Sequence, residues 1–401
     1  MLNMKTLQNV CTKESGLKTN MQKCVLKKIE MAELNINIDR IAGNIISISN
    51  FLAKANITWS LVTKVLSGER ELLEHILTRE RMQGIHSFGD SRISSLRNIK
   101  DVCSEAITVY IKPPATAYAE DVVRYADISL NSSLRTIVKL NDFAKKMKRR
   151  HQVVIMVELG ELREGVLRDN LVDFYNRVFN LDNIEVIGLG ANLGCMYGVE
   201  PTYDKLLQLS LYKQVLELRF NRNLPILSGG SSITLPLVDA GKMPADINHL
   251  RIGEAAFFGT SPLNNELFRD LDGRTFEYYA NIIELAEKDM VPDGIISDGN
   301  VGHTIEFDSA RRGRKTIKAI LDFGLIDVDL SSLKALDKTV KFVGITSDMT
   351  VVDVGSNRAK NGSKKYHVGD TILFKPDYMG VARLLNSRFT GKRIVKNSVL
   401  E

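Results

Sequence analysis

The chain has 401 residues, of which 44% are hydrophobic and 25% are charged, and its formal net charge is +6. This is the composition of a globular protein, and it excludes a disordered chain and a coiled coil. The basic residues gather near the two ends without interleaved aromatic residues, so we expect no nucleic-acid partner.

A helix is predicted over residues 36–53, and eight short apolar runs follow between about residue 60 and residue 257. The runs are SLVTKVL, GIHSFGD, AITVYIK, DISLNS, QVVIMVEL, IEVIGLG, PILSGG and HLRIGEA. Most are nearly continuous in apolar residues, as strands buried on both faces are. Stretches with helical spacing separate several of them, namely LRTIVKLNDFAKKMKRR, NLVDFYNRVFN and YDKLLQLSLYKQVLELRF. Alternating strands and helices imply parallel strands, and eight such units predict a closed (β/α)8 barrel.

An open, doubly wound sheet is the competing geometry for such a pattern. That fold would carry a G-x-G-x-x-G turn after an early strand, and the sequence has none there.

The pattern changes after Gly259. Residues 270–300 begin with a helical pattern, and the short strands KFVGIT, TVVDV and DTILFKP follow from about residue 303. Residues 356–365 predict a hairpin-type loop with Asn361-Gly362 at its tip. The sequence therefore predicts an α/β protein with three parts: a tail over 1–32, a barrel over 33–265 and a smaller, mainly β domain over 266–401.

The four cysteines, Cys11, Cys24, Cys103 and Cys195, show no C-x-x-C spacing and no histidine cluster. We therefore expect no metal site and no disulfide framework, which fits a reducing compartment. No apolar run approaches the roughly 20 residues of a membrane span, and the first thirty residues lack the apolar segment of a secretory signal. We expect a cytoplasmic protein without a membrane partner.

Polar side chains collect at the predicted C-terminal ends of the strands, which form the active-site mouth of a barrel. Lys64 lies in the first run, and it has two interpretations. A lysine there can reach solvent or pair with a carboxylate. Alternatively, its amine can lose its proton in a dry pocket and form an imine with a carbonyl cofactor such as pyridoxal phosphate.

A phosphate site is predicted from the segments after the seventh and eighth strands. Gly229, Gly230, Ser231 and Ser232 offer backbone N–H groups and hydroxyls, and Gly253 offers another N–H. Phosphate sites after these two strands recur in barrels. Arg251 either forms an ion pair with Glu158 or Asp90, or donates to the pyridine nitrogen; an arginine stays protonated and would leave that nitrogen unprotonated.

The ordered motifs resemble the alanine racemase superfamily, most closely its ornithine racemase-like branch. The motifs are VTKV, HSFGDSRI, MVELGELREG, GLGANLGC, SGGSS and LRIGEA, with KAILDFGLIDVD, GITSD and VGDTILF near the C-terminus. The resemblance covers about residues 33 to 390. It implies a barrel that binds pyridoxal 5'-phosphate, a following β domain, a small amino-acid substrate and a homodimer.

The family's functional residues fall on specific positions of this sequence. The resemblance implies that Lys64 forms the Schiff base, that Arg251 faces the pyridine ring, and that Arg163 lies near the substrate carboxylate. It places the phosphate-binding groups at Ser231, Ser232, Gly253 and Glu254, and Asn192 where alanine racemases carry a histidine near the ring. Two departures are Ser231, where the ornithine-type pattern has Asn, and Met349, where relatives often have a polar residue.

The resemblance implies amino-acid racemisation, in which Lys64 takes the α-proton from one face and a second group returns a proton on the other. Tyr378, Asp348 and His303 are the candidates for the second group, including from a partner subunit; Tyr378 also fits a half-buried strand aromatic. Acidic residues near the mouth favour a basic substrate such as ornithine, lysine or arginine, or they pair with neighbouring arginines; they are Asp90, Glu161, Glu164 and Glu254.

Two other functions fit the same scaffold. One is a lyase or decarboxylase, although a decarboxylase would place an acid, not Arg251, at the pyridine nitrogen. The other is a non-catalytic pyridoxal phosphate-binding protein, a class that resembles the barrel alone.

Overall fold

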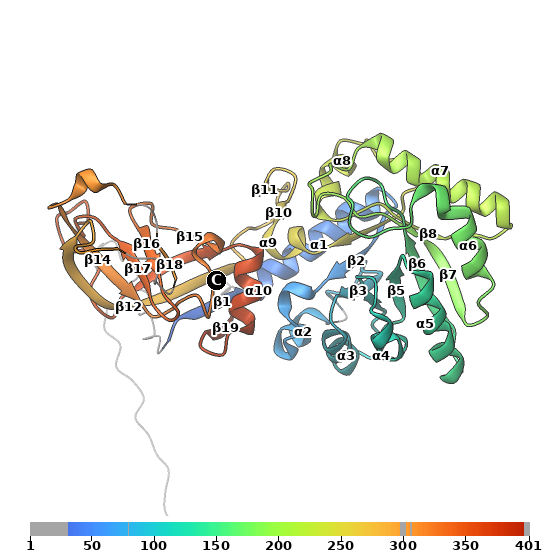
Figure 1. Ribbon diagram of the computed structural model, residues 1–401, viewed down its shortest axis with the longest axis horizontal. Coiled ribbons are helices and arrows are strands. Elements are labelled where there is room, and N and C mark those ends of the chain that lie inside the picture. Colours follow the sequence, from blue (N-terminus) through green and yellow to red (C-terminus); the bar gives the residue numbers. More distant parts are fainter. Residues whose placement is uncertain (1–30, 79, 297–301, 305–306, 397–401) are drawn as a thin grey trace, which may run out of the picture. The chain divides into compact units, whose positions relative to one another are not determined.

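The computed structural model describes residues 31–78, 80–296, 302–304 and 307–396 (Figure 1). Eight parallel strands form a closed barrel in which each strand pairs with the next and the last pairs with the first. They are β2 (Thr58–Val62), β3 (Ser87–Asp90), β4 (Thr108–Tyr110), β5 (Ile128–Asn131), β6 (His151–Met156), β7 (Ile184–Gly190), β8 (Ile226–Ser228) and β9 (His249–Ile252). Each strand overlaps one of the eight apolar runs, and β2 and β6 begin one or two residues before theirs, so the predicted (β/α)8 barrel is confirmed.

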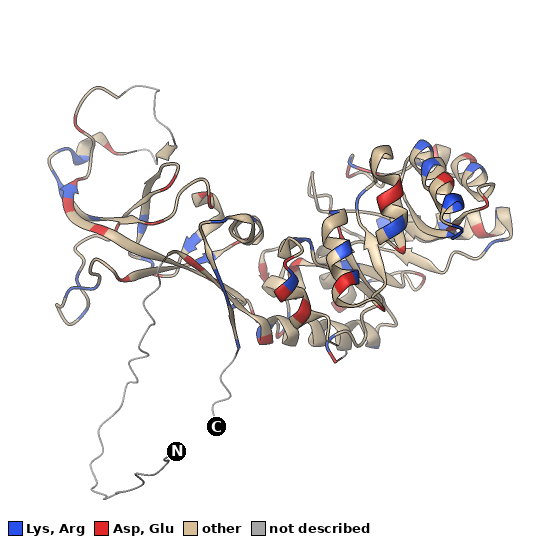
Figure 2. Ribbon diagram, turned by 90° about the horizontal axis from the view of Figure 1, so that it is seen from below, with Lys and Arg blue, Asp and Glu red and all other residues tan. Residues whose placement is uncertain are grey.

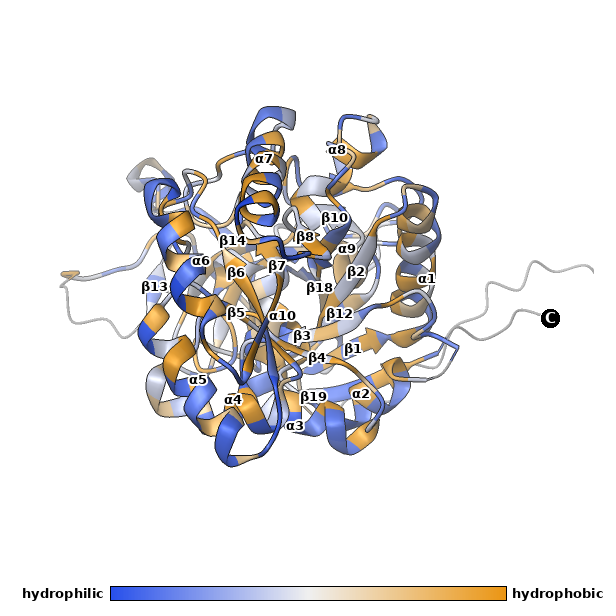
Figure 3. Ribbon diagram, turned by 90° about the vertical axis from the view of Figure 1, so that its right-hand side faces the viewer, coloured by the Kyte–Doolittle hydropathy of each residue, from blue (hydrophilic) through white to orange (hydrophobic). Residues whose placement is uncertain are grey.

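Helices surround the barrel strands, as the view in Figure 3 shows for α1 to α8. They are α1 (Ile38–Lys54), α2 (Arg70–Ile76), α3 (Ile93–Val102), α4 (Ala119–Tyr125), α5 (Leu134–Lys146), α6 (Leu171–Phe179), α7 (Tyr203–Phe220), α8 (Leu235–Asp239) and α9 (Glu254–Phe258). Helix α1 confirms the helix predicted before the first strand, and the Asn37 side chain caps it by accepting from the Arg40 N–H at 3.1 Å. Acidic and basic residues are interspersed on the outer helices (Figure 2).

The second domain is built on a nine-stranded sheet. Its strands are β1 (Glu33–Asn37), β12 (Phe276–Asp289), β13 (His303–Thr304), β14 (Lys315–Leu321), β15 (Leu333–Ala335), β16 (Lys341–Ile345), β17 (Thr350–Asp353), β18 (Thr371–Pro376) and β19 (Gly391–Val395). A separate short pair, β10 (Thr260–Ser261) with β11 (Glu266–Leu267), follows α9, and helix α10 (Tyr378–Asn386) follows β18. Strand β1 pairs with β12 and β19, so one strand of this sheet comes from the range predicted for the barrel.

Two local predictions in the second domain were wrong. The helical pattern after residue 270 is the long strand β12, in which Phe276, Tyr278, Ala280 and Ile282 are buried on alternate positions. Pairing with β1, β14 and β18 overrides the helical propensity of this segment. Tyr378 begins helix α10, capped by the Asp377 side chain, and does not lie in a strand.

Helix α10 contacts the turn that follows the first barrel strand. The Asn386 side chain donates to the Ser67 hydroxyl at 2.7 Å, and Lys392 pairs with Glu69 at 3.3 Å. These contacts bring Tyr378, at the start of α10, to the end of the barrel where Lys64 lies. In the part of the chain that the structure describes, no helix is long and apolar enough to cross a membrane.

Candidate active site

A cavity of about 610 Å³ lies at the C-terminal ends of the barrel strands. Nine of the ten residues predicted for the site line it: Lys64, Arg163, Asn192, Ser231, Ser232, Arg251, Gly253, Glu254 and Tyr378. Of its charged lining residues, Lys64, Lys112, Arg163 and Arg251 are basic, whereas Glu164 and Glu254 are acidic. The excess of basic side chains favours an anionic ligand.

Lys64 lies beyond the strand in which the sequence placed it. Strand β2 ends at Val62, and Lys64 begins a 3-10 turn over Lys64–Leu66 that points its side chain into the cavity while Val65 and Leu66 are buried. Lys64 is exposed, so its amine is not desolvated in this structure, and its role in forming an imine stays a prediction. Its Nζ lies 5.5 Å from the centre of the Tyr378 ring.

Arg251 lies on β9 at the floor of the cavity and is 6% exposed. Its guanidinium donates to the Ser228 hydroxyl and, at 2.7 Å, to the Ala191 carbonyl. Neither Glu158 nor Asp90 is its partner: Glu158 accepts backbone N–H groups of its own loop, and Asp90 accepts from Thr63 and the Arg92 N–H. Burial lowers the pKa of Arg251 to about 10, so the guanidinium is charged at neutral pH.

Arg163 is held at the cavity wall by its neighbours. Its guanidinium forms an ion pair with Glu164, which raises the Arg163 pKa, and it also donates to the Cys195 sulfur. With its amide oxygen turned toward Arg163, Asn192 accepts from the two Nη atoms at 3.0 and 3.2 Å. Arg163 and Asn192, both predicted as site residues, are thus in contact. Glu164 already forms an ion pair with Arg163.

Glu161 holds the loop that follows strand β7. Its carboxylate is 2% exposed and accepts backbone N–H groups from five residues: Gly194, Cys195, Met196, Tyr197 and Val199. Desolvation would raise the Glu161 pKa, but the hydrogen bonds outweigh it and lower the pKa to about 2. The sequence suggested Glu161 as an acid facing a basic substrate; the structure instead makes it the centre of a loop that contributes Gly194 and Cys195 to the cavity.

The segment after β8 approaches the cavity with backbone and hydroxyl groups. Gly230 has a φ of +126°, and a Cβ atom there would lie 2.5 Å from the Thr234 hydroxyl, so only glycine fits without strain. Ser232 accepts from the Ala255 N–H at 3.1 Å, which ties this segment to the start of α9. A Cβ atom on Gly253 would lie 3.1 Å from the Val62 carbonyl, so the strand end packs closely here.

Tyr378 presents an unpartnered hydroxyl. The oxygen is buried and has no hydrogen-bond partner within the described residues. Burial, and then the nearby Asp90 and Glu254 carboxylates, raise the Tyr378 pKa above its ordinary value. The hydroxyl therefore keeps its proton and is suited to donate to a ligand oxygen.

Two carboxyl groups close to this end of the barrel have raised pKa values. Burial raises the pKa of Asp90, which is 1% exposed, to about 6, against the hydrogen bonds from Arg92 and Thr63. Burial and the neighbouring Asp377 raise the pKa of Glu254, whereas Lys64 opposes the rise. Of the two acidic residues that line the cavity, Glu164 pairs with Arg163, and Glu254 makes no side-chain hydrogen bond among the described residues.

The structure does not bring Asp348 or His303 to the Lys64 cavity within one chain. Asp348 is exposed in the turn between β16 and β17, where it accepts from Ser347. His303 is exposed on β13 and lies 3.9 Å from Asp329. Their proposed entry from a partner subunit stays a prediction.

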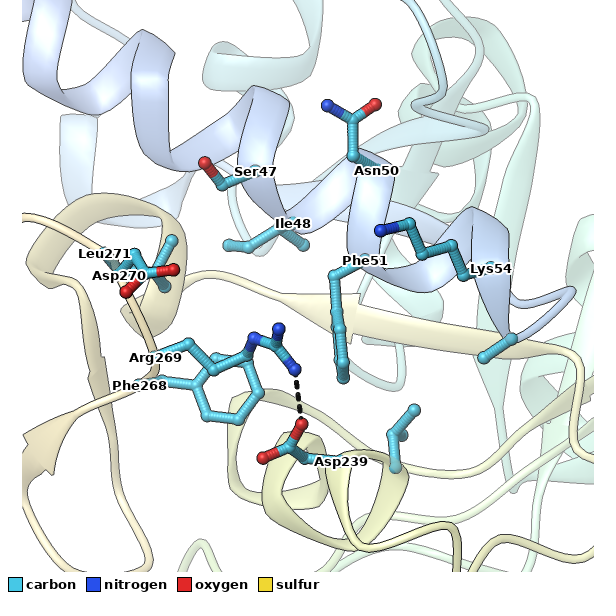
Figure 4. Close-up of a pocket in the computed structure, with 12 residues that line it drawn as sticks. Ser47, Ile48, Asn50, Phe51, Lys54, Asp239, Phe268, Arg269, Asp270 and Leu271 are labelled. Carbon is cyan, nitrogen blue, oxygen red and sulfur yellow. Dashed lines mark hydrogen bonds and ion pairs between the residues drawn. The ribbon is translucent and has the colours of Figure 1, made fainter.

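A second cavity, of about 440 Å³, lies outside the barrel beside α1 (Figure 4). Arg269 donates to Asp239 there and lies over the Phe51 ring at 5.0 Å from its centre. None of the predicted site residues lines this cavity. In the described ranges, no group of three or more His, Cys, Asp and Glu side chains could hold a metal ion.

Comparison with known proteins gives both a family and a fold. Residues 36–262 match the family model of the alanine racemase N-terminal domain. The chain is 33% identical to the ornithine racemase of Acetoanaerobium sticklandii over 364 residues, which cover 90% of this chain and 99% of that protein. It is 30% identical to the lysine racemase of Thermotoga maritima over 359 residues, covering 90% and 97%.

Solved structures share the two-domain fold at low identity. An alanine racemase of Clostridium difficile has a TM-score of 0.69 and 15% identity, covering 92% of this chain and 97% of that one. The alanine racemase of Bartonella henselae, solved with covalently bound pyridoxal phosphate, has a TM-score of 0.68 and 16% identity, covering 92% and 100%. A D-threonine aldolase of Filomicrobium marinum has a TM-score of 0.64 and 14% identity, covering 92% and 94%, so the fold also occurs in a lyase.

Proposed function

This chain belongs to the alanine racemase superfamily, in its ornithine racemase-like branch, and we propose that it is a racemase of basic amino acids that uses pyridoxal 5'-phosphate. The observation that supports the proposal is that one cavity is lined by a lysine amine, a buried arginine, and two segments that follow barrel strands and offer serine hydroxyls or glycine N–H groups. These are Lys64, Arg251, Ser231 with Ser232, and Gly253.

The residues present fit the cofactor. The cavity has an excess of basic side chains, which suits a phosphate, and a tightly packed glycine turn that lets a ligand approach the backbone closely. It also has the buried Tyr378 hydroxyl, which has no hydrogen-bond partner in the described part of the chain. We propose that Lys64 forms the imine link, that Arg251 faces the pyridine ring beside Asn192, and that Ser231, Ser232 and the N–H groups of Gly253 and Glu254 hold the phosphate.

The cofactor, when bound, supplies a conjugated ring that spreads the negative charge left when the substrate loses its α-proton. The chain's own residues position the proton transfers. The Lys64 amine accepts the α-proton on one face, a placed group whose contribution is typically about 10²–10⁴-fold. Arg251 stays protonated and would donate a hydrogen bond to the pyridine nitrogen of the cofactor. Arg163 would orient the substrate carboxylate, because its planar guanidinium can donate two parallel N–H groups to the two oxygens.

The proposed substrate class rests on the named relatives and on one available acid. The relatives are an ornithine racemase and a lysine racemase. Asp90 and Glu161 are bound to backbone N–H groups and Glu164 is paired, which leaves Glu254 as the cavity carboxylate that can receive a terminal ammonium group. We also propose a cytoplasmic homodimer, as the sequence resemblance implies.

The decisive experiment compares the parent protein with Lys64→Ala. After reconstitution with pyridoxal phosphate, the parent should be yellow, and borohydride should bleach it and fix the cofactor to Lys64; the variant should stay colourless. Incubation with L-ornithine, L-lysine and L-alanine in D₂O should show loss of the α-proton signal and appearance of the D form for the two basic amino acids. Release of carbon dioxide or cleavage products instead would favour a lyase. If no amino acid exchanges its α-proton, both the racemase and the lyase hypotheses are contradicted.

A further inference from the structure

A chain of hydrogen-bonded side chains runs inside the barrel behind Arg251. Ser60, Ser87, Ser228, His249 and Arg251 line one small internal cavity together with His86. Ser60, Ser228 and Ser87 are each 1% exposed, and His249 is 5% exposed. His249 and Arg251 are two residues apart on β9, so both side chains point to the interior.

The charge on Arg251, together with the need of each buried hydroxyl hydrogen for an acceptor, sets the direction of the bonds in this chain. A guanidinium has donors only, so the Ser228 oxygen accepts from it. The Ser228 hydroxyl then donates to Nδ1 of His249 at 2.8 Å. Nδ1 is therefore the unprotonated nitrogen, and Nε2 carries the hydrogen and donates to the Ser60 oxygen at 2.9 Å.

The same logic continues to the far end of the chain. Ser60 donates to Ser87 at 2.6 Å, and Ser87 donates to Nδ1 of His86 at 3.0 Å. Arg251 begins the order as a donor and His86 Nδ1 ends it as an acceptor, while Ser228, His249, Ser60 and Ser87 each accept one hydrogen and donate one. Reversing one of these bonds would leave a buried hydroxyl hydrogen without an acceptor in the chain, which is unfavourable in a buried site.

His249 is not placed to act on a substrate. It lines the small internal cavity and not the Lys64 cavity. Burial, and then the charge of Arg251, lower its pKa well below the ordinary value, which agrees with a neutral ring. Among the described residues, the hydrogen bonds of its side chain lead to the Lys64 cavity through Ser228 and Arg251.

We propose that Ser228 and His249 are positioning residues, which hold the Arg251 guanidinium at the floor of the cavity through a His249 ring fixed as the neutral Nε2–H tautomer. Ser228 and the Ala191 carbonyl take two of the five N–H groups of Arg251, one on each Nη atom, and leave others for the cavity. The inference rests on the proposed function in one respect: it takes Arg251 to be the residue that faces the cofactor ring.

The first test measures the tautomer without any cofactor or activity. The chain has six histidines, so ¹⁵N-histidine labelling with two-bond ¹H–¹⁵N correlation, and His249→Asn for assignment, can report each ring. We expect neutral, Nε2-protonated His249 from about pH 5.5 to about pH 8.5. An Nδ1-protonated ring or an imidazolium in this range would overturn the proposal, whatever the enzyme does.

The second test uses variants with a matched control. His249→Leu removes the acceptor of Ser228, and we expect kcat to fall by about tenfold or more with little change in KM, because a misplacement of about 1 Å can cost roughly 100-fold. His249→Asn keeps an acceptor oxygen near the Nδ1 position and should recover a large part of the loss. The control is His151→Leu, since His151 is also fully buried in the barrel but bonds Ser129, at 2.7 Å, and not the Arg251 chain.

The outcomes separate the two claims. Equal kcat for His249→Leu and the parent, or equal losses for His249→Leu and His151→Leu, would refute the positioning role while leaving the racemase intact. If His249→Leu does not fold by its melting curve, Ser228→Ala tests the same bond with a smaller change and the same expected loss. A parent without racemase activity would contradict the proposed function, and the tautomer would still be decided by the first test.

Discussion

At the scale of single residues, the candidate site was largely predictable because the barrel forces it. The C-terminal ends of parallel strands meet at one mouth, so polar residues after the runs had to converge there. Nine predicted residues do line one cavity. The sequence could not show which groups hydrogen-bond to each other. The five backbone bonds to Glu161 depend on the conformation of a loop, and the Ser228–His249 bond behind Arg251 depends on strand register. The position of Arg251 and His249, two residues apart, was the only available signal.

Tyr378 gives a prediction that separates two roles. Its raised pKa makes it a poor base at neutral pH, and its unpartnered hydroxyl makes it a good donor. We therefore expect Tyr378→Phe to raise the Kd for pyridoxal phosphate by about 10-fold to 100-fold, the value of a hydrogen bond to a charged group, and to keep measurable racemisation. Fluorescence titration measures the Kd. Unchanged affinity with α-proton exchange from only one enantiomer would instead identify Tyr378 as the second proton-transfer group.

Glu254 gives a prediction about substrate choice. If it receives the terminal ammonium group, Glu254→Gln should lower kcat/KM for ornithine and lysine by about 10-fold to 100-fold, as loss of a charge-assisted bond does. Activity with a neutral amino acid should change far less. The matched variant is Glu164→Gln, which breaks the pair with Arg163 and should affect all amino acids alike. Equal losses for basic and neutral substrates in Glu254→Gln would contradict the assignment.

At the scale of elements, helices and strands whose residues all favour one conformation were predictable, whereas segments with conflicting propensities were not. Each barrel strand is apolar because both its faces are covered, and α7 was recognised over its full length from its sequence. Strand β12 contains strong helix formers such as Glu284, Leu285 and Ala286, and these three residues are held in the strand by pairing with β14. Helix α10 was missed because its capping residue, Asp377, follows directly on β18.

The loop over residues 194–199 gives a prediction about acid stability. The Glu161 pKa is lowered from an ordinary 4.5 to about 2, so the carboxylate stabilises the fold fully above about pH 4.5, and this contribution is lost as the pH falls toward 2. Glu161→Gln should lower the free energy of unfolding by about 1–3 kcal/mol at neutral pH. It should also flatten the fall in stability between about pH 4.5 and pH 2.

Chemical denaturation over this pH range measures both effects. Glu158→Gln is the comparison, because Glu158 accepts three backbone N–H groups but is only half-buried. A larger loss in Glu158→Gln than in Glu161→Gln would contradict the role given to Glu161.

At the scale of the whole molecule, the two domains are joined because a strand from the N-terminal side of the barrel lies in the sheet of the second domain. The order of motifs along the sequence did not predict this. Strand β1 precedes the barrel in sequence but lies between β12 and β19 in the sheet, and it leads directly into α1 of the barrel. Helix α10 contacts the turn that carries Lys64. The sheet and the barrel should therefore unfold together.

The single tryptophan, Trp59, tests this directly. It lies fully buried on β2 and donates to Ser49 of α1, so its fluorescence reports the barrel. Leu34→Ala in β1 removes a fully buried side chain from the sheet and should lower the free energy of unfolding measured at Trp59 by about 2–5 kcal/mol. Leu218→Ala, at an 86% exposed position on α7, is the control and should change it little. An unchanged Trp59 transition in Leu34→Ala would mean that the sheet unfolds independently.

The parallel pairing of β1 with β19, in which residues 33–37 lie against residues 391–395, also sets an order for events on the ribosome. Barrel strands can pair with their neighbours as they emerge at about 5–20 residues per second, whereas β1 must wait for both of its partners. A nascent chain therefore carries an unmatched strand edge through most of its synthesis. The alternation of Glu33, Asn35 and Asn37 with buried Leu34 and Ile36 gives that waiting edge one polar face, which disfavours pairing with a neighbouring chain before the cognate strand arrives.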